Sequence, residues 1–226
     1  MDMQVEPPPL SLTVMLEHER AEMPFGAILW DMDGVLIDSL ALIRRRLSEW
    51  AERHRLEPES VITFSPGRMF ADVVREFLPS ADVDDELRWC AERDAVDLDG
   101  IGPSPGACEL LATLDNSQWA VVTSTPRAVT FARLAATGIA APAVVVTADD
   151  VARGKPAPHC YLLAASRLGV PPDACVVIED AQAGVEAGRA AGCHVIAVGG
   201  VHAEPWAGAD FIVPNLLSLA ISTEEP

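Results

Sequence analysis

Short apolar runs alternate with amphipathic stretches along most of this chain. Two of the stretches, 157–168 and 181–191, are predicted to be helices, because each is followed by a glycine of the kind that ends helices, Gly169 and Gly192. Six runs are rich in Val and Ile and apolar on both faces, which is typical of buried parallel strands. These runs are 27–30, 120–123, 143–147, 175–178, 194–198 and 211–213. The alternation predicts an α/β fold with a doubly wound parallel (Rossmann-like) sheet core.

The alternation is interrupted between Asp31 and Trp119, where no parallel strand is predicted. A crossover between two parallel strands needs only about a dozen residues and its helix. The interval holds three helical stripes instead, formed by Leu40, Ile43, Leu47 and Trp50, by Phe70, Val73, Val74 and Phe77, and by Val83, Leu87, Cys90 and Ala91. We therefore expect a small inserted α-helical cap domain at about 40–104, with 25–39 and 105–226 forming the core. Two interpretations stay open: the stripes pack into the core, or they form a mobile cap over the carboxyl ends of the strands.

Residues 1–24 are expected to be a disordered N-terminal tail. Glu6 is followed by three prolines, which cannot join a helix or a central strand. The segment also lacks the positive charge that begins a secretory signal.

Composition narrows the classes of function. The 226 residues include 16 basic and 34 acidic side chains, for a formal net charge of −18. A chain this acidic is not expected to bind nucleic acid or an anionic membrane. No apolar run reaches the roughly 18 to 20 residues that span a bilayer. The five cysteines are scattered rather than paired, which argues against a zinc ribbon or a disulfide scaffold and predicts a reducing, cytoplasmic setting.

Two aspartates stand at the end of the first predicted strand. Asp31 and Asp33 follow it directly and precede Gly34. One carboxylate there can attack a phosphoryl centre, and the other can exchange protons with the leaving oxygen and with water. The same residue types also begin ordinary turns. A calcium loop is excluded, because Val35 and Ile37 stand where oxygen ligands are needed.

Lys155 is the only lysine in the chain, and the other basic residues are arginines. This bias suggests that the position requires a compact ammonium group rather than a planar guanidinium. Lys155 lies between Gly154 and Pro156, ahead of a predicted helix, where it can neutralise a phosphate and a nearby carboxylate. The alternative is a solvated lysine without a role. A nucleotide P-loop is excluded, because Asp149 stands where its first glycine would be.

Two further strand ends carry polar residues. Thr123 and Ser124 follow an apolar run, and their hydroxyl and backbone N–H groups can hold phosphate oxygens or simply cap the next helix. Glu179 and Asp180 follow another run, and they can cap a helix or bind a hard cation. Because the carboxyl ends of parallel strands meet at one edge, all these groups are expected to face one crevice.

This combination of strand-end motifs resembles that of the haloacid dehalogenase superfamily. The four motifs are Asp31 with Asp33, Thr123, Lys155, and Glu179 with Asp180. The similarity covers about residues 25–215, and the helical insertion matches the family's small cap. The branch it resembles contains sugar-phosphate phosphatases, glycerol-phosphate phosphatases and β-phosphoglucomutase.

The resemblance implies a role for each motif residue. Asp31 would be the nucleophile and Asp33 the general acid and base. Thr123 and the N–H of Ser124 would bind the phosphoryl group, and Lys155 would hold both the phosphate and Asp31.

The resemblance also implies Mg²⁺ as cofactor. Asp31, the backbone carbonyl of Asp33, and Asp180 would be its ligands, with Glu179 assisting directly or through water. Asp33 argues against the dehalogenase branch, which works without a second acid and without metal.

The cap would select the substrate. The segment 65–68 matches a cap loop that contacts substrate in the family, and Arg68 is the candidate cation there. Related phosphatases often have His-Gly-Arg at this place, so Pro66 departs from the pattern. Arg68 can also be a surface arginine that begins a helix.

Three functions stay open. The first is a Mg²⁺-dependent phosphatase that hydrolyses a small sugar or polyol phosphate through an aspartyl-phosphate. The second is a sugar phosphomutase that uses the same intermediate, and the third is a non-catalytic phosphate-binding regulator. The expected partner is a small phosphorylated metabolite, bound by a monomer or a weak homodimer.

Overall fold

The computed structural model describes residues 10–15, 20–94, 96–199 and 206–223. At its centre lies a six-stranded parallel sheet of order β10-β9-β8-β3-β6-β7. Its strands are β3 (Ala27–Trp30), β6 (Trp119–Val122), β7 (Val144–Val146), β8 (Cys175–Glu179), β9 (His194–Val198) and β10 (Phe211–Val213). The predicted doubly wound parallel sheet is confirmed, and each strand end lies within one residue of its predicted position.

The sheet is covered on both faces, because successive side chains of a strand point in opposite directions. Leu29 belongs to a core that packs under α7 and α8, and Ile28 belongs to a second core that packs under α5 and α6. These helices are α5 (Ala107–Leu111), α6 (Arg127–Thr137), α7 (His159–Leu168) and α8 (Gln182–Ala191). Burial on both faces explains why the strands are apolar without alternation.

The strand order reverses at β3. The chain adds β6 and β7 on one side of β3, and β8, β9 and β10 on its other side. At such a switch point the flanking connections diverge and leave a crevice outside the carboxyl ends of the strands. Asp31 follows β3 directly and therefore stands at this crevice.

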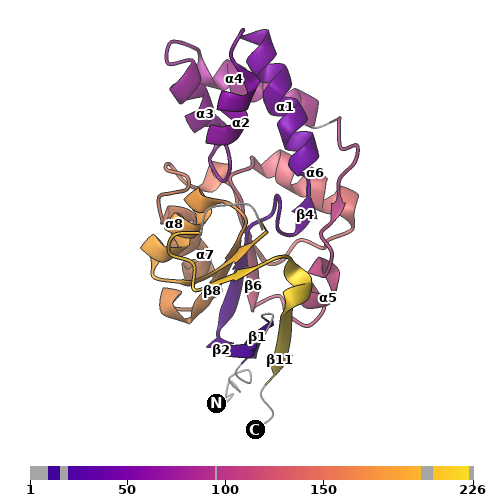
Figure 1. Ribbon diagram of the computed structural model, residues 1–226, viewed down its shortest axis with the longest axis vertical. Helices are drawn as coiled ribbons and strands as arrows, with labels where there is room; N and C mark the ends of the chain where they lie inside the picture. Colours follow the sequence, from indigo (N-terminus) through magenta and orange to yellow (C-terminus); the bar gives the residue numbers. More distant parts are fainter. Residues whose placement is uncertain (1–9, 16–19, 95, 200–205, 224–226) are drawn as a thin grey trace, which may run out of the picture.

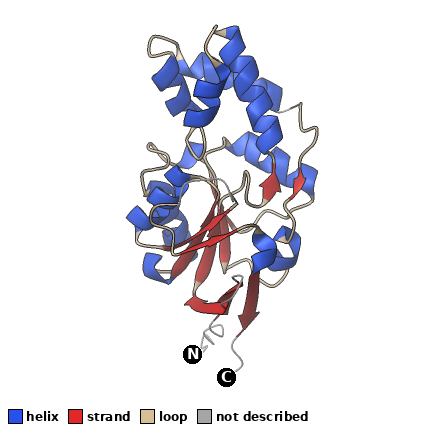
Figure 2. Ribbon diagram, viewed as in Figure 1, coloured by secondary structure: helices blue, strands red, loops and turns tan. Residues whose placement is uncertain are grey.

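Four helices form a separate layer over the carboxyl ends of the sheet (Figure 1). This helical layer consists of α1 (Leu40–Arg53), α2 (Pro58–Phe64), α3 (Phe70–Phe77) and α4 (Val83–Asp94). It has its own apolar core, in which Trp50 and Val74 are fully buried. All four helices fall inside the interval predicted to be inserted, and Figure 2 shows no strand among them.

The chain leaves and re-enters the core at neighbouring points. The short strands β4 (Ile37–Asp38) and β5 (Gly102–Pro103) pair antiparallel just before α1 and after α4. The two connections to the helical layer therefore lie side by side.

The expectation of a disordered N-terminal tail is wrong for the part of it that the structure describes. β1 (Leu10–Met15) and β2 (Arg20–Phe25) pair antiparallel, and β1 also pairs with β11 (Leu219–Thr223). Leu12 and Val14 of β1 are fully buried against the main core. Residues 1–9 and 16–19, which include the prolines that suggested disorder, lie outside the described residues.

The described residues contain no helix that is both long enough and apolar enough to cross a membrane.

Candidate active site

A tight turn after β3 sets the position of both aspartates. Asp31 is fixed at its backbone, because its N–H donates to the carbonyl of Ile178 on β8 at 3.0 Å. The chain then turns at Gly34, whose φ is +85°. A Cβ at Gly34 would meet Oδ2 of Asp180 at 1.9 Å, so glycine is needed both for the backbone conformation and for this close approach.

Lys155 lies beneath this turn, where three oxygen atoms surround its ammonium group. Its Nζ is 2.5 Å from Oδ1 of Asp31, 2.6 Å from Oε1 of Glu179 and 3.2 Å from the carbonyl oxygen of Val122. Only 2% of Lys155 is exposed. The predicted functional lysine is therefore buried against the predicted nucleophile rather than solvated.

Glu179 has hydrogen-bond partners at both of its oxygens. Oε1 accepts from Lys155 and from the hydroxyl of Tyr161 at 2.8 Å. Oε2 accepts the backbone N–H groups of Asp180 and Ala181, at the start of α8. Gly184 makes room for this carboxylate, because a Cβ there would meet Oε1 of Glu179 at 1.7 Å. Glu179 thus holds Lys155 in place from below.

The charges of this cluster do not cancel. Burial raises the pKa of Asp31 to about 8, and the carboxylates of Glu179 and Asp33 add to this rise while Lys155 opposes it. Burial and Asp31 likewise raise the pKa of Asp180 well above its usual range. Burial alone would lower the pKa of Lys155, but attraction to Asp31 and Glu179 raises it instead. Several carboxylates thus share one ammonium group, and the site has an excess of negative charge.

This excess fits a bound cation. Oxygens of Asp31, Glu179 and Asp180 lie within 4.8 Å of one another. Ligand sets made only of oxygen suit hard divalent cations such as Mg²⁺ and Ca²⁺. Because Glu179 is already hydrogen-bonded at both oxygens, Asp31 and Asp180 are the better placed direct ligands.

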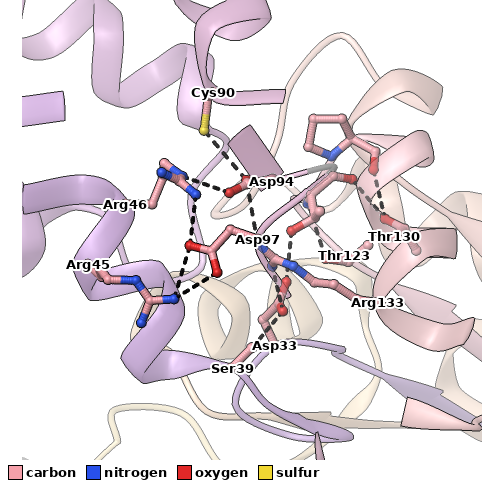
Figure 3. Close-up of polar contacts among 12 residues, drawn as sticks. Asp33, Ser39, Arg45, Arg46, Cys90, Asp94, Asp97, Thr123, Thr130 and Arg133 are labelled. Atoms are coloured by element: carbon pink, nitrogen blue, oxygen red, sulfur yellow. Dashed lines mark hydrogen bonds and ion pairs between the residues drawn. The ribbon is translucent and has the colours of Figure 1, made fainter. Parts of the chain in front are cut away.

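Asp33 points to a different set of partners from Asp31. Its Oδ1 accepts from Ser39 Oγ at 2.6 Å and from Arg133 Nη1 at 2.7 Å (Figure 3). Its Oδ2 accepts from Thr125 Oγ1 at 2.8 Å. These donors come from three separate segments of the chain. The direction of the Asp33 carboxyl group is therefore closely defined.

Thr123 and Ser124 stand at the end of β6. The N–H of Thr123 continues the sheet by donating to Val146 O at 2.9 Å, and its Oγ1 accepts the N–H of Thr125 at 3.1 Å. The hydroxyl of Ser124 donates to the carbonyl of Gly67 at 2.7 Å. Ser124 therefore links the sheet to the helical layer.

A cavity of about 350 Å³ lies between the sheet and the helical layer. Of the predicted site residues, Asp31, Asp33, Thr123, Ser124, Asp180 and Arg68 line it. Lys155 and Glu179 do not line the cavity. They lie beneath Asp31, where Lys155 contacts both the Asp31 carboxylate and Glu179.

Arg68 is the predicted site residue from the helical layer. It lies between α2 and α3, where its Nε donates to Phe64 O at 3.1 Å and its guanidinium lies 4.6 Å from the Phe64 ring centroid. No carboxylate of the described chain forms an ion pair with it. Arg68 thus lines the cavity without a counter-charge among the described residues.

Sequence reasoning missed four residues that contact the predicted ones, namely Ser39, Thr125, Arg133 and Tyr161. Arg133 had a usable signal, because it falls on the buried face of α6 beside Val129 and Leu134. A charged residue on an apolar stripe indicates a buried partner. The hydroxyl groups gave no comparable signal.

Comparisons with known proteins agree with this geometry. The family model described as haloacid dehalogenase-like hydrolase matches residues 25–192. Hexitol phosphatase A of Escherichia coli is 46% identical over 175 residues, which cover 75% of this chain and 81% of that protein. Fructose-1-phosphate phosphatase YqaB of Escherichia coli is 32% identical, over 77% of this chain and 96% of that protein.

A solved structure shows the same arrangement of elements. CbbY of Rhodobacter sphaeroides, crystallised in complex with phosphate, superimposes with a TM-score of 0.71 at 29% identity. The match covers 85% of this chain and 95% of that one. With the family model covering well over half of the chain, we conclude that this protein belongs to the haloacid dehalogenase-like hydrolase family.

Proposed function

We propose that this protein is a Mg²⁺-dependent phosphatase that hydrolyses a small sugar or polyol phosphate through an aspartyl-phosphate. The observation that carries the proposal is the contact of Lys155 with Asp31 at the floor of the cavity, with Asp180 and Asp33 beside it. Two relatives named as sugar- or hexitol-phosphate phosphatases support the substrate class.

In the first step an oxygen of Asp31 attacks phosphorus. A bond forms between that oxygen and phosphorus, and the bond between phosphorus and the ester oxygen of the substrate breaks. Asp33 gives a proton to the departing oxygen, so that the alcohol leaves neutral. Lys155 orients Asp31 for the attack by donating a hydrogen bond to Oδ1, and its positive charge favours the ionised form of Asp31 against the effect of burial.

In the second step a water molecule attacks the phosphorylated Asp31. Asp33 accepts a proton from this water, and the new bond between water oxygen and phosphorus replaces the bond to Asp31. Inorganic phosphate leaves and the Asp31 carboxylate is restored. Thr123 and the N–H of Ser124 hold the phosphoryl oxygens during both steps.

Asp31 and Asp180 would hold the Mg²⁺ ion, together with the backbone carbonyl of Asp33, and Glu179 would support them. When bound, the ion supplies positive charge that offsets the carboxylates and the phosphoryl oxygens. The raised pKa values of Asp31 and Asp180 support this assignment, because burial and, to a lesser extent, the neighbouring carboxylates disfavour their ionised forms, which a bound cation would stabilise.

The helical layer would contact the leaving group of the substrate. Arg68 offers an unpaired positive charge to it, and Asp94 and Arg46 add polar groups to the cavity wall. A small phosphorylated metabolite is the partner that these contacts fit.

The test is a phosphate-release assay with Mg²⁺ over hexitol phosphates, fructose 1-phosphate, glycerol 1-phosphate and hexose phosphates. We expect turnover of at least one polyol or sugar phosphate and its loss by a factor of at least about 10³ in Asp31→Asn. The matched control is Asp99→Asn, an exposed aspartate, which should retain activity.

Other outcomes would point to the other functions. Formation of a sugar phosphate isomer without phosphate release would indicate a mutase. No turnover of the whole panel, with phosphate still bound, would indicate a non-catalytic phosphate-binding protein.

A further inference from the structure

Arg133 is a buried arginine that none of the proposed steps uses. It lies on α6 and only 3% of it is exposed. Arginine is almost never buried unless it is paired, because removing its charge from water is costly. Its partners therefore indicate why the fold retains it.

These partners belong to two different parts of the molecule. Nη1 of Arg133 donates to Asp33 Oδ1 at 2.7 Å, and Nη2 lies 3.5 Å from Oδ2 of Asp94. Asp33 stands at the end of the central strand, whereas Asp94 is the last residue of α4 in the helical layer. Nε of Arg133 is buried and has no hydrogen-bond partner among the described residues. One cation thus stands between two carboxylates, one on each side of the cavity.

Asp94 is itself held from the side of the helical layer. Its Oδ1 accepts from Nε of Arg46 at 3.0 Å, and the side chain of Arg46 is only 7% exposed. Arg46 Nη2 in turn lies 3.3 Å from Asp97 (Figure 3). Charges of alternating sign therefore run without interruption from Asp33 into α1.

We propose that Arg133 is a positioning residue, which fixes the direction of the Asp33 carboxyl group and makes that direction depend on where the helical layer sits. The effect on turnover rests on the proposed function, in which Asp33 protonates the leaving group. The guanidinium group suits this task because its donors have fixed directions and can contact two carboxylates at once.

The two distances show how the dependence arises. The contact with Asp33 is a short hydrogen bond, whereas the contact with Asp94 is longer than one. While the helical layer lies close to the core, Asp94 anchors Nη2 of Arg133 and keeps Nη1 directed at Asp33. If the layer moves away, the guanidinium loses this second anchor and its direction toward Asp33 is no longer fixed. The position of the helical layer thereby affects the direction of the Asp33 carboxyl group.

The kinetic test compares Arg133→Met with wild type on two substrates. An alkyl phosphate such as glycerol 1-phosphate needs a well-placed acid, because an alkoxide is a poor leaving group. p-Nitrophenyl phosphate releases a stable anion and needs little protonation. We expect kcat to fall by about 10²-fold on the alkyl phosphate and by less than about 3-fold on p-nitrophenyl phosphate, with KM changed by less than about 3-fold.

Two further variants separate positioning from a general structural effect. Arg133→Lys keeps the charge and should recover part of the loss in kcat. Arg189→Met removes an arginine that pairs with Asp210 at the surface and should leave both activities unchanged. Equal losses on both substrates, or a change in KM alone, would overturn the positioning role.

The link to the helical layer is tested with Asp94→Asn. Alone it should lower kcat on the alkyl phosphate by about 10-fold, and in the Arg133→Met background it should have almost no further effect. Independent, multiplicative effects of the two substitutions would contradict the link through Arg133.

Crystal structures of the wild type and of Arg133→Lys, without metal or substrate, supply a readout that needs no activity. We expect the Asp33 carboxylate to take a different rotamer or to split into two in the variant. An unchanged Asp33 would reject the positioning role even if the protein proves inactive on every phosphomonoester. An inactive wild type with a displaced Asp33 would instead reject the proposed function and keep the inference.

Discussion

At the scale of single residues, Lys155 shows why a lysine and not an arginine occupies the centre of the site. An ammonium group has three N–H donors, and three acceptors surround this one: Asp31, Glu179 and the carbonyl of Val122. A guanidinium group is larger and planar, and its donors diverge in one plane. The cage therefore matches lysine both in size and in the number of its hydrogen bonds.

Substituting Lys155 is expected to affect both catalysis and stability. Lys155→Arg should lower kcat/KM by at least about 10²-fold despite equal charge, because the longer side chain displaces Asp31. Lys155→Met should also lower the free energy of unfolding by about 3 kcal/mol, because Asp31 and Glu179 lose their buried counter-charge. Steady-state kinetics and urea unfolding would measure the two effects.

The control for Lys155 is an exposed ion pair. Arg88→Met removes a contact with Asp85 in which both side chains are more than 60% exposed, and it should change stability by less than about 1 kcal/mol. Near-normal kcat/KM for Lys155→Arg would mean that the position requires only a positive charge.

The sequence marks some site residues more clearly than others. Lys155 stands out as the only lysine, and Asp31 and Asp180 stand out as acidic residues at the ends of apolar runs. Arg133 lies 100 positions from its partner Asp33, and Tyr161 lies 18 from Glu179. Such pairs are set by how the elements pack, which periodicity and spacing along one chain do not reveal.

At the scale of elements, Asp150 joins three segments beside the site. It ends the short helix η1 (Ala148–Asp150), where Oδ2 accepts the N–H and the hydroxyl of Thr147. Its Oδ1 accepts from Arg167 of α7 at 2.8 Å, and its Oδ2 from Arg127 of α6 at 2.7 Å. One carboxylate therefore fixes the beginning of α6 and the end of α7 against the connection that leads to Lys155.

Asp150 should contribute stability that depends on pH. Burial would raise its pKa, but the hydrogen bonds from Arg167 and Thr147 outweigh burial and lower the pKa from 3.8 to about 2. A depressed pKa means that the unfolded chain binds the proton more tightly, so the stabilisation is complete above about pH 4 and is lost as the pH falls toward 2. We expect Asp150→Asn to cost roughly 2 kcal/mol at pH 7 and progressively less below pH 4.

Urea unfolding of wild type and Asp150→Asn between pH 2.5 and 7 would measure this difference. Asp173→Asn, which lacks these contacts, serves as the control. A stability difference that stays constant over the whole range would show that the charge of Asp150 contributes nothing.

The small sheet formed by β1, β2 and β11 is an element that sequence analysis did not predict. β1 pairs with residues near the other end of the chain, with Leu10 opposite Thr223 and Val14 opposite Leu219. Pairing between distant segments leaves no local signal, and the prolines before β1 favoured disorder. The six parallel strands were predictable because they are apolar along most of their length, as expected for strands that are largely buried on both faces. Ile212 of the edge strand β10 is an exposed exception.

Leu12 is expected to contribute to stability as a core residue. It is fully buried within β1, so Leu12→Ala should lower the free energy of unfolding by about 2 to 5 kcal/mol through lost burial and a residual cavity. Met15→Ala, at a residue of the same strand that is 46% exposed, should cost less than about 1 kcal/mol. A loss below 1 kcal/mol for Leu12→Ala would place the N-terminal strands outside the cooperative core.

At the scale of the whole molecule, the helical layer contacts the core at several points around the cavity. Gly67, between α2 and α3, accepts a hydrogen bond from Ser124 at 2.7 Å, and Asp94 faces Arg133. Between these contacts lie Asp31 and Asp33 on the core side and Arg68 on the other. The interrupted alternation of strands and helices predicts an insertion at about 40–104, and α1 to α4 fall inside this interval. The contacts of the layer with the core join residues far apart in sequence, which leaves no local pattern.

Gly67 offers a test of how closely the helical layer must approach the core. Its φ is +73°, and a Cβ there would lie 2.9 Å from the Cβ of Ala181, next to Asp180. Gly67→Ala should therefore push the layer away from the site and lower kcat/KM by about 10-fold or more. The matched control is Gly100→Ala, because Gly100 has a similar φ of +81° but has no atom within 4 Å of an added Cβ.

Both glycine substitutions introduce the same backbone strain, so each should lower the free energy of unfolding by about 1 kcal/mol. Only Gly67→Ala adds a steric conflict between the helical layer and the core, so only it should lose activity. Kinetics and urea unfolding on the pair separate the two effects. Equal activity of the two variants would show that the layer does not need close contact at Gly67 for turnover, and that Arg133 and Asp94 suffice to define its position.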